Sequence, residues 1–226
     1  MTLKFLARAA ALLALILSIS GLATTSAAAE TAAEFYKGKV VKLVVGYGPG
    51  GGFDTYARLL APHLEQRLGA TVVVENRPGG GGMVAISQLA ASRGDSLTLV
   101  LANLEAAALG QLLDSPGIRF DVTELSTIAR VSAEPKVALL SAESPFSSLD
   151  DLRTADRPIK WGGGGKTDGI ADSAAIFSES LGLNSEIVIG YKGSKETSLA
   201  AIRGEVDGLF ISAGTARKLT AKGDLV

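Results

Sequence analysis

The sequence predicts an α/β fold, in which parallel-rich sheet is covered by helices on both faces. Two observations support this prediction. Short runs rich in β-branched residues alternate along the chain with longer amphipathic segments, and several of these runs end directly in glycine-rich loops. Such alternation is typical of parallel sheets, because each parallel strand needs a crossover that returns the chain to the same end of the sheet.

The first half of the chain shows the pattern clearly. The apolar run Val40–Val45 predicts a buried strand, which leads into the loop Gly46–Gly52. A helix over Phe53–Leu68 follows, and Pro62 predicts a kink or a fresh turn within it. One face of this helix carries Phe53, Tyr56, Ala57, Leu60, Leu64 and Leu68. The next predicted elements are the strand Thr71–Glu75, a helix over about Met83–Ala91, the strand Leu97–Leu101 and the helix Leu104–Leu113.

The second half repeats the alternation. The predicted elements are the strand Val137–Ser141, a short helix over Ser148–Arg153, the strand Pro158–Trp161, a helix with Ile170, Ala174, Phe177 and Leu181 on one face, the strand Glu186–Gly190, the helix Ser194–Arg203 and the strand Gly208–Ile211. Crossovers around Thr127–Ala133 and Ile211–Gly214 would suit a two-lobed molecule with two hinge segments.

Residues 1–29 are predicted to be a secretory signal peptide. Lys4 and Arg8 form a positive start, an apolar run covers residues 9–19, and Ala27–Ala29 supply small residues before a cleavage point at Glu30. The apolar run is short of the roughly 20 residues that a membrane-spanning helix needs. The expected location is therefore the periplasm. We expect lobe 1 over residues 30–130, lobe 2 over 131–212, and the start of a return into lobe 1 over 213–226.

The composition narrows the classes of function. The chain has 226 residues, 47% of them hydrophobic, which is enough for one large domain or two small lobes. A formal net charge of −1 and an aromatic content of 5% argue against a nucleic-acid partner. There is no cysteine and only one histidine, which excludes a thiolate nucleophile, a disulfide framework and a Cys/His metal site. No cofactor is expected, and the protein is expected to be a monomer.

Three predicted strands end in glycine-rich loops, at Gly48–Gly52, Gly79–Gly82 and Gly162–Gly165. Ligands of open α/β sheets bind at the carboxyl ends of the strands. Glycine lets backbone N–H groups approach a ligand closely, and the helix that follows offers unpaired N–H groups and the positive end of its dipole. Turn geometry explains any one such loop equally well. Three of them at equivalent strand ends favour anion binding.

Two enzyme-like patterns occur in the same loops. The segment from Gly46 to Gly51 fits the dinucleotide-binding fingerprint, and Glu75 ends the next strand, near where a ribose-binding acid belongs. A nucleotide (NAD)-dependent Rossmann-like enzyme therefore stays an alternative, although export and the two further glycine loops argue against it. The segment from Gly162 to Thr167 ends like a phosphate-binding loop, but Lys160 stands where that motif needs its first glycine.

No catalytic constellation emerges, so we do not expect an enzyme. His63 lies beside Pro62 and off the apolar face of its helix, and no Ser-His-Asp arrangement can be assembled from it. Asp54 lies in the first turn after the first loop. It is either a helix-start acid favoured by the dipole, or a ligand contact that faces a donor group, a hydroxyl or a bridging water.

An acid with the same two possible roles follows the third loop. Asp168 follows it as either a helix-start acid or a ligand contact, with Thr167 as a rival cap. Lys166 and Lys192 are candidate cationic partners of a ligand, although a solvated lysine is the commoner outcome.

Several motifs resemble one known family. The segment Val44–Asp54, followed by Ala57-Arg58, resembles the opening of Bug-type receptors, the substrate-binding proteins of tripartite tricarboxylate transporters (TctC family). The segment Val72–Gly82 resembles their second signature, and Gly190–Gly193 and Gly204–Asp207 resemble later ones. The resemblance covers the chain from about Phe35 to its end.

The resemblance implies a type II periplasmic binding protein fold, whose two lobes close on a small carboxylate for delivery to the membrane permease subunits of the transporter. The match at the third loop is loose, because family members often place serine or alanine there. Ligand-binding positions implied by the motifs are Tyr47, Gly50, Gly51, Gly52 and Asp54 in the first loop, Gly164, Gly165, Lys166 and Thr167 in the third, and Tyr191 and Lys192 in the later signature.

The end of the sequence gives one further expectation. Family members continue well past the position that corresponds to Val226. We therefore expect the first lobe to be incomplete, and a nonfunctional truncated receptor remnant stays a second alternative.

Overall fold

The computed structural model describes residues 30–92, 94, 96–221, 223 and 225–226. The predicted signal peptide lies outside the described residues. The fold lies in the compact unit Tyr36–Val226, and the short helix α2 (Ala32–Tyr36) precedes it along the chain. None of the described helices is long and apolar enough to cross a membrane.

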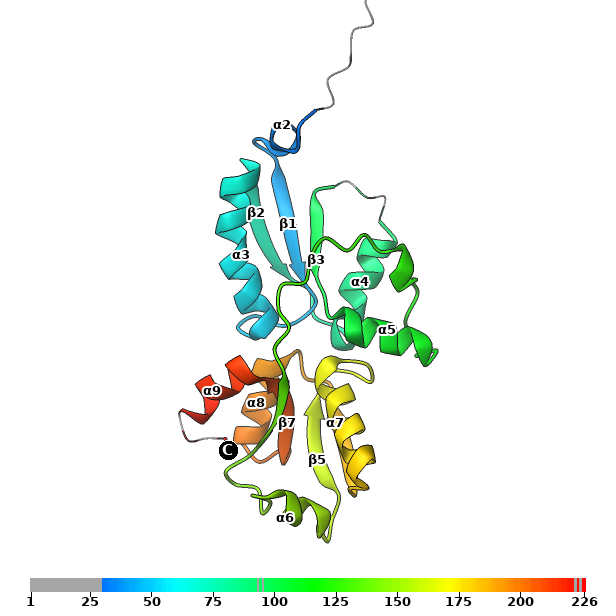
Figure 1. Ribbon diagram of the computed structural model, residues 1–226, viewed down its shortest axis with the longest axis vertical. Helices are drawn as coiled ribbons and strands as arrows, with labels where there is room; N and C mark the ends of the chain where they lie inside the picture. Colours follow the sequence, from blue (N-terminus) through cyan, green and yellow to red (C-terminus); the bar gives the residue numbers. More distant parts are fainter. Residues whose placement is uncertain (1–29, 93, 95, 222, 224) are drawn as a thin grey trace, which may run out of the picture. The chain divides into compact units, whose positions relative to one another are not determined.

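The first sheet consists of the parallel strands β1 (Val40–Val45), β2 (Thr71–Asn76) and β3 (Thr98–Leu101), in the order β2-β1-β3 (Figure 1). The helix α3 (Gly52–Leu68) packs on β1 and β2, and α4 (Met83–Ala90) packs on β3. The remaining elements here are η1 (Gly80–Gly82), α5 (Leu104–Leu112) and η2 (Val122–Glu124). Helices therefore cover both faces of this sheet, as the alternation of strands and helices predicts.

The apolar spacing of α3 explains its position. Its residues Ala57 and Ala61 are buried against Val41, Leu43 and Val45 of β1. The helix runs through Pro62 to Leu68 and ends at Gly69, whose φ of 63° is left-handed. The sequence predicts a kink or a fresh turn at Pro62, whereas the structure has one continuous helical segment across this position.

The second sheet contains β4 (Lys136–Leu140), β5 (Ile159–Gly163), β6 (Ser185–Ile189) and β7 (Gly208–Ser212), in the order β4-β7-β5-β6. Strands β5, β6 and β7 are parallel, and β4 is antiparallel to β7. The helices of this part are α6 (Leu149–Arg153), α7 (Gly169–Leu181), α8 (Ser194–Ile202) and α9 (Ala213–Thr220). Trp161 is fully buried against Ala174 of α7, and its indole N–H donates to Ser178 Oγ at 3.1 Å.

The first predicted crossover, before β4, joins the two sheets, whereas the second leads from β7 into α9, which stays on the second sheet. Lys136, at the start of β4, pairs with Ser212, at the end of β7, and the amide of Ala213 donates to Pro135 O at 3.0 Å. The sequence predicts that residues 213–226 begin a return into lobe 1. In the structure α9 packs on β4 and β7, and Val226 forms two backbone hydrogen bonds with Leu140. Leu225 is buried in the core of the second sheet, which holds the end of the chain there.

Candidate functional site

A pocket of about 290 Å³ is lined by the whole second glycine loop, by Gly164 of the third, and by Gly46 and Tyr47, which precede the first. The predicted ligand-binding residues Gly50, Gly51, Gly52, Asp54 and Gly165 are not part of its lining. The pocket lies at the carboxyl ends of strands from both sheets. Its lining consists of Gly46, Tyr47, Pro78, Gly79, Gly80, Gly81, Gly82, Gly164, Gly190, Tyr191 and Lys192. Because most of these residues are glycines, backbone groups of both lobes can approach a ligand directly.

The first glycine loop is covered by the start of α8 and the residues before it. The amide of Gly48 donates to Lys192 O at 2.6 Å, and the amide of Gly52 donates to Ser194 Oγ at 3.4 Å. A Cβ at Gly50 would lie 3.1 Å from Lys195 Nζ. Two of the amides on which the first-loop prediction depends are therefore bonded across the lobes in this structure.

Asp54 stabilises the conformation of the first loop through hydrogen bonds and an ion pair. One carboxylate oxygen accepts from the Gly50 amide at 2.8 Å and from Arg58 Nε at 3.0 Å, and the other lies 3.0 Å from Arg58 NH2. Burial opposes ionisation of Asp54, but Arg58 and the Gly50 amide outweigh it and hold the pKa below its usual value. These contacts support the helix-start interpretation. A direct ligand contact by Asp54 stays a prediction.

Asp168 organises the third loop in the same way. It is buried, with 1% of its surface exposed, and its carboxylate accepts from the amides of Gly164, Gly165, Ile170 and Ala171. Asp168, and not its rival Thr167, is therefore the cap of α7. The amides of Gly164 and Gly165 already have an acceptor, so they would have to exchange it to bind a ligand.

The second glycine loop offers the unused donors. Gly80, Gly81 and Gly82 all have positive φ, which glycine adopts without strain. Within the described part of the chain, the amides of Gly79, Gly80 and Gly81 donate no hydrogen bond. The motif analysis singled out this loop but assigned it no ligand contact. Its signal was the unbroken run of four glycines after a strand.

Tyr47 joins the first and second loops. Its hydroxyl donates to Gly81 O at 2.9 Å, and its ring stacks on Phe53 with 4.5 Å between centroids. Burial, and then the charge of Asp168, raise the pKa of Tyr47 well above its usual value, against a hydrogen bond from Asn103. The phenol therefore stays protonated and forms a fixed wall of the pocket.

Two residues of the later signature, Tyr191 and Lys192, line the pocket. Tyr191 is partly buried and packs against the core of the second sheet. Burial, followed by the Glu205 charge, raises the pKa of its phenol. Lys192 is exposed, lines the pocket and has no carboxylate within ion-pair distance among the described residues.

Two predicted residues of the third loop lie beside the pocket. Lys166 is exposed and is not part of the lining. Thr167 is half-buried, and its methyl group lies 3.3 Å from where a Cβ at Gly110 of α5 would stand. Thr167 therefore contributes to the contact between the lobes.

Asp172 is a residue that the motif analysis missed. It lies four residues after Asp168, a spacing that places both acids on one face of α7. One of its carboxylate oxygens is buried without a hydrogen-bond partner in the structure. Burial, and then the Asp168 charge, raise the pKa of Asp172 to about 6, and Lys136 opposes this shift.

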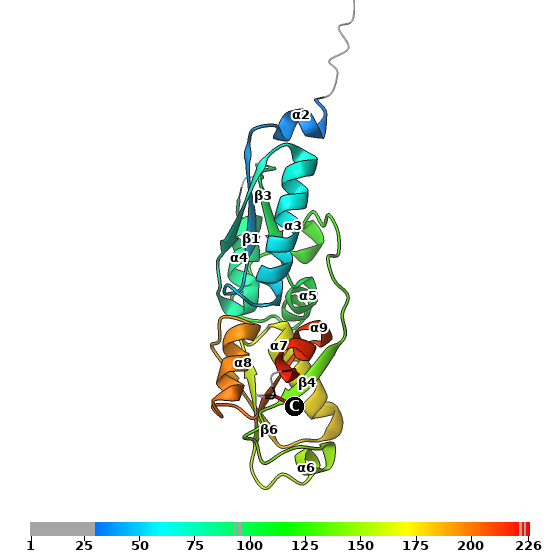
Figure 2. The ribbon, with the colours of Figure 1, turned by 90° about the vertical axis from the view of Figure 1, so that its left-hand side faces the viewer.

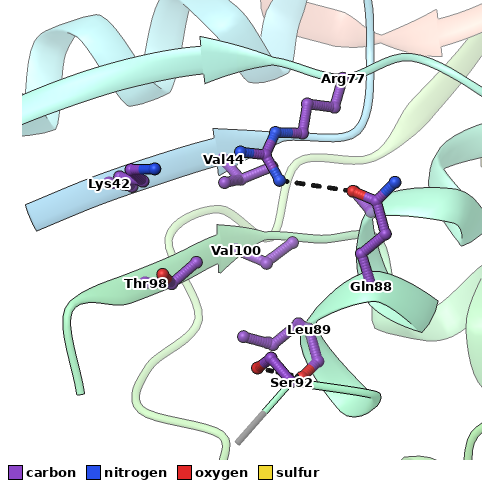
Figure 3. A pocket seen from close by; sticks show the side chains of 9 residues that line it. Lys42, Val44, Arg77, Gln88, Leu89, Ser92, Thr98 and Val100 are labelled. Atoms are coloured by element: carbon purple, nitrogen blue, oxygen red, sulfur yellow. Dashed lines mark hydrogen bonds between the residues drawn. The ribbon is translucent and has the colours of Figure 1, made fainter. Parts of the chain in front are cut away.

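A second pocket, of about 360 Å³, lies on the first sheet away from the glycine loops (Figure 3). Its apolar wall includes Val44 and Val100. Its two cations share one acid, because Lys42 lies 3.7 Å and Arg77 lies 2.5 Å from the Glu75 carboxylate. Glu75 is thus engaged by cations of this pocket, which removes support for its ribose-binding role.

These features define a class of protein. Two α/β lobes are joined by the segment that leads into β4, and glycine loops from both lobes meet at the carboxyl ends of their strands. The described residues contain no group of three or more His, Asp or Glu side chains placed to hold a metal ion. The architecture is that of a two-lobed binding protein.

The family model described as the tripartite tricarboxylate transporter family receptor (TctC) matches residues 56–226. The chain therefore belongs to the TctC receptor family. It is 29% identical to a UPF0065 protein of Bordetella pertussis over 216 residues, which cover 93% of this chain and 66% of that protein. It is 34% identical to protein BugT of the same organism over 140 residues, 61% of this chain and 43% of BugT. The chain thus spans two thirds or less of the length of these relatives.

Solved structures confirm the predicted fold. MatC from Rhodopseudomonas palustris with bound malate matches with a TM-score of 0.76 and 21% identity, over 83% of this chain and 65% of that one. The periplasmic binding protein BugD matches with a TM-score of 0.71 and 22% identity, over 84% of this chain and 64% of BugD. The α/β fold with parallel-rich sheets is therefore that of the TctC-type periplasmic binding proteins.

Proposed function

We propose that this chain acts in a periplasmic receptor, which captures a small carboxylate between its lobes and delivers it to the membrane subunits of a tripartite transporter. One observation carries the proposal. Gly79, Gly80 and Gly81, whose amides donate no hydrogen bond in the described part of the chain, line the same pocket as Lys192, which has no ion-pair partner there. We propose a binding role and no catalytic one.

The chemistry of the pocket suits a carboxylate. An ionised carboxylate has only acceptors, and it binds best where several N–H donors and a positive charge converge. The second loop presents such donors from the first lobe, and Lys192 supplies the charge from the second lobe. A ligand held by both would favour the closed arrangement, because it bonds to both lobes only when they are close together.

Two structural neighbours add support for the ligand class. MatC has bound malate, and Rpa4515 from R. palustris, which matches with a TM-score of 0.69, has adipate. Both ligands are dicarboxylates of a size that fits a pocket of about 290 Å³. We propose that small dicarboxylates belong to the ligand class of this chain as well.

Thermal unfolding of the purified chain tests the proposal. Malate, adipate and citrate should each be added at millimolar concentration, with NAD as a separate arm. A ligand at about 100 times its dissociation constant stabilises the folded state by about 2.7 kcal/mol, which raises the midpoint by several degrees. We expect such a rise with at least one carboxylate.

The other outcomes separate the alternatives. A rise with NAD alone would favour the Rossmann-like enzyme. A cooperative transition that no carboxylate moves would contradict the receptor proposal. A broad, uncooperative transition would support the nonfunctional remnant.

A further inference from the structure

One side chain in the connection between the lobes bonds to a helix of each lobe. Glu134 lies in this connection, two residues before β4, and Gly214 lies at the start of α9, directly after β7 of the second lobe. Figure 2 shows α9 beside β4, and the two elements are in contact. Tyr56 lies on α3 of the first lobe.

The carboxylate of Glu134 bonds to both neighbours. Its Oε1 accepts from the Tyr56 hydroxyl, and its Oε2 accepts from the Gly214 amide at 2.8 Å. One exposed side chain therefore ties α3 of the first lobe to the start of α9 in the second. An exposed glutamate is normally free to change rotamer, so two simultaneous bonds between the lobes restrict both the side chain and the elements that it joins.

The residues around the Glu134 carboxylate favour both its position and its negative charge. A Cβ at position 214 would lie 2.6 Å from Glu134 Oε2, so a larger residue there would displace the carboxylate from its present position. The start of α9 also favours a negative charge. The hydrogen bond from Tyr56, and then that from the Gly214 amide, lower the pKa of Glu134, which keeps it ionised at neutral pH.

The position of Tyr56 connects this contact to the pocket. Tyr56 lies four residues after Gly52, which places it one helical turn from the first glycine loop. A contact that holds Tyr56 in place therefore also holds the end of α3 that follows this loop. The loop in turn contacts the second lobe through Gly48 and Lys192.

We propose that Glu134 is a positioning residue that limits how far the first lobe can swing away from the second. Its two hydrogen bonds hold α3 of the first lobe against α9 of the second and so raise the population of the closed arrangement. The apparent dissociation constant of a ligand rises when the binding-competent population falls. This consequence for affinity rests on the proposed function, whereas the effect on the lobes does not.

Distances between spin labels test the effect on the lobes directly. The chain has no cysteine, so Leu59→Cys on α3 and Leu199→Cys on α8 would give two unique sites for labels. Both leucines are exposed, at 61% and 43%. Pulsed electron resonance should show a longer or broader distance distribution in Glu134→Ala and in Tyr56→Phe than in the parent. The double variant should add little to Glu134→Ala, because that substitution already removes the contact with Tyr56.

Matched variants make the test specific. Glu124→Ala also removes an exposed glutamate of the first lobe, one whose side chain makes no hydrogen bond in the described part of the chain, and should leave the distances unchanged. Tyr56→Phe keeps the ring and deletes only the donor, so it stays informative if Glu134→Ala folds poorly. A distribution in Tyr56→Phe that coincides with that of the parent would overturn the proposal.

Affinity measurements separate this inference from the proposed function. For any carboxylate that stabilises the parent, Glu134→Ala should weaken binding about tenfold, with less than a twofold change in Glu124→Ala. If the distances change but no carboxylate binds the parent, the receptor function fails and the role of Glu134 stands. If carboxylates bind equally well to parent and variant and the distances agree, the receptor function stands and the role of Glu134 fails.

Discussion

The amide of Gly48 in the first lobe donates a hydrogen bond of 2.6 Å to the carbonyl of Lys192 in the second lobe. A Cβ at position 48 would lie 3.2 Å from that carbonyl oxygen, so a side chain there would fit only if the Lys192 backbone moved by a few tenths of an ångström. The contact joins two loops that also line the candidate pocket. Opening of the lobes must break it, and changes to its neighbours should therefore alter binding.

Gly81→Ala should prevent full closure. Its Cβ would lie 2.5 Å from Asp168 Cβ and 2.6 Å from Thr167 O, both in the second lobe. Titration calorimetry should show at least tenfold weaker binding of any carboxylate that the parent binds. Gly38→Ala is the matched control, because its φ of 72° is also positive but nothing lies within 4 Å of the added atom. Equal affinity in both variants would contradict closure at Gly81.

Lys192→Gln should weaken carboxylate binding by about tenfold and reduce its salt dependence. The ammonium is the charge that the pocket lining supplies, and screening by salt acts on such an exposed group. Dissociation constants at low and high salt, about 20 mM and about 500 mM, would measure both effects. Lys218→Gln, on the exposed part of α9, removes a positive charge outside the pocket lining and should change neither the affinity nor its salt dependence. An unchanged affinity in Lys192→Gln would argue that backbone donors alone hold the ligand.

Asp168→Asn should destabilise the fold by about 2–4 kcal/mol, since a buried carboxylate that accepts four amide hydrogen bonds becomes an amide with one acceptor oxygen. Chemical denaturation would measure the loss. Asp121→Asn removes a carboxylate that caps the short η2 on the surface, and should cost less than about 1 kcal/mol. Similar losses in both variants would show that the buried network of Asp168 contributes nothing beyond a cap.

Asp172→Asn should stabilise the protein at neutral pH. The folded-state pKa of Asp172 is about 6, above the ordinary value of 3.8, because burial and Asp168 outweigh Lys136. Between these pH values the native state binds more protons at Asp172 than the unfolded state does. The free energy of unfolding therefore falls as the pH rises from about 4 to about 6. Tyr47, which also lies near this carboxyl group, remains uncharged over that range.

The free energy of unfolding, measured from about pH 4 to about pH 7, checks this prediction. Asp172→Asn should flatten the decrease and add about 1–2 kcal/mol at neutral pH, after allowance for partial exposure to solvent. Asp150→Asn, whose side chain is 90% exposed, should follow the profile of the parent. If the free energy of unfolding of Asp172→Asn decreases with pH as it does in the parent, a group other than Asp172 causes the decrease.

Much of the fold follows from local sequence. The run Val40–Val45 forms β1 with the predicted bounds, and its apolar residues Val41, Leu43, Val44 and Val45 are buried, on both faces of the sheet. Asp168 caps α7, as its position before the helix allowed. The motifs also led to the family that the comparisons confirm. The lobe boundaries and the individual ligand contacts stay predictions.

The sequence by itself determined which segments become strands, helices and glycine loops, because these depend on spacing and on neighbours within one or two turns. Only the tertiary structure decided which loop amides are left unbonded and which are taken by Lys192 or Ser194. It likewise decided that Glu134 meets Tyr56, 78 residues away. Such contacts depend on how two separately folded sheets pack, and a glycine run carries no information about the partner that will face it.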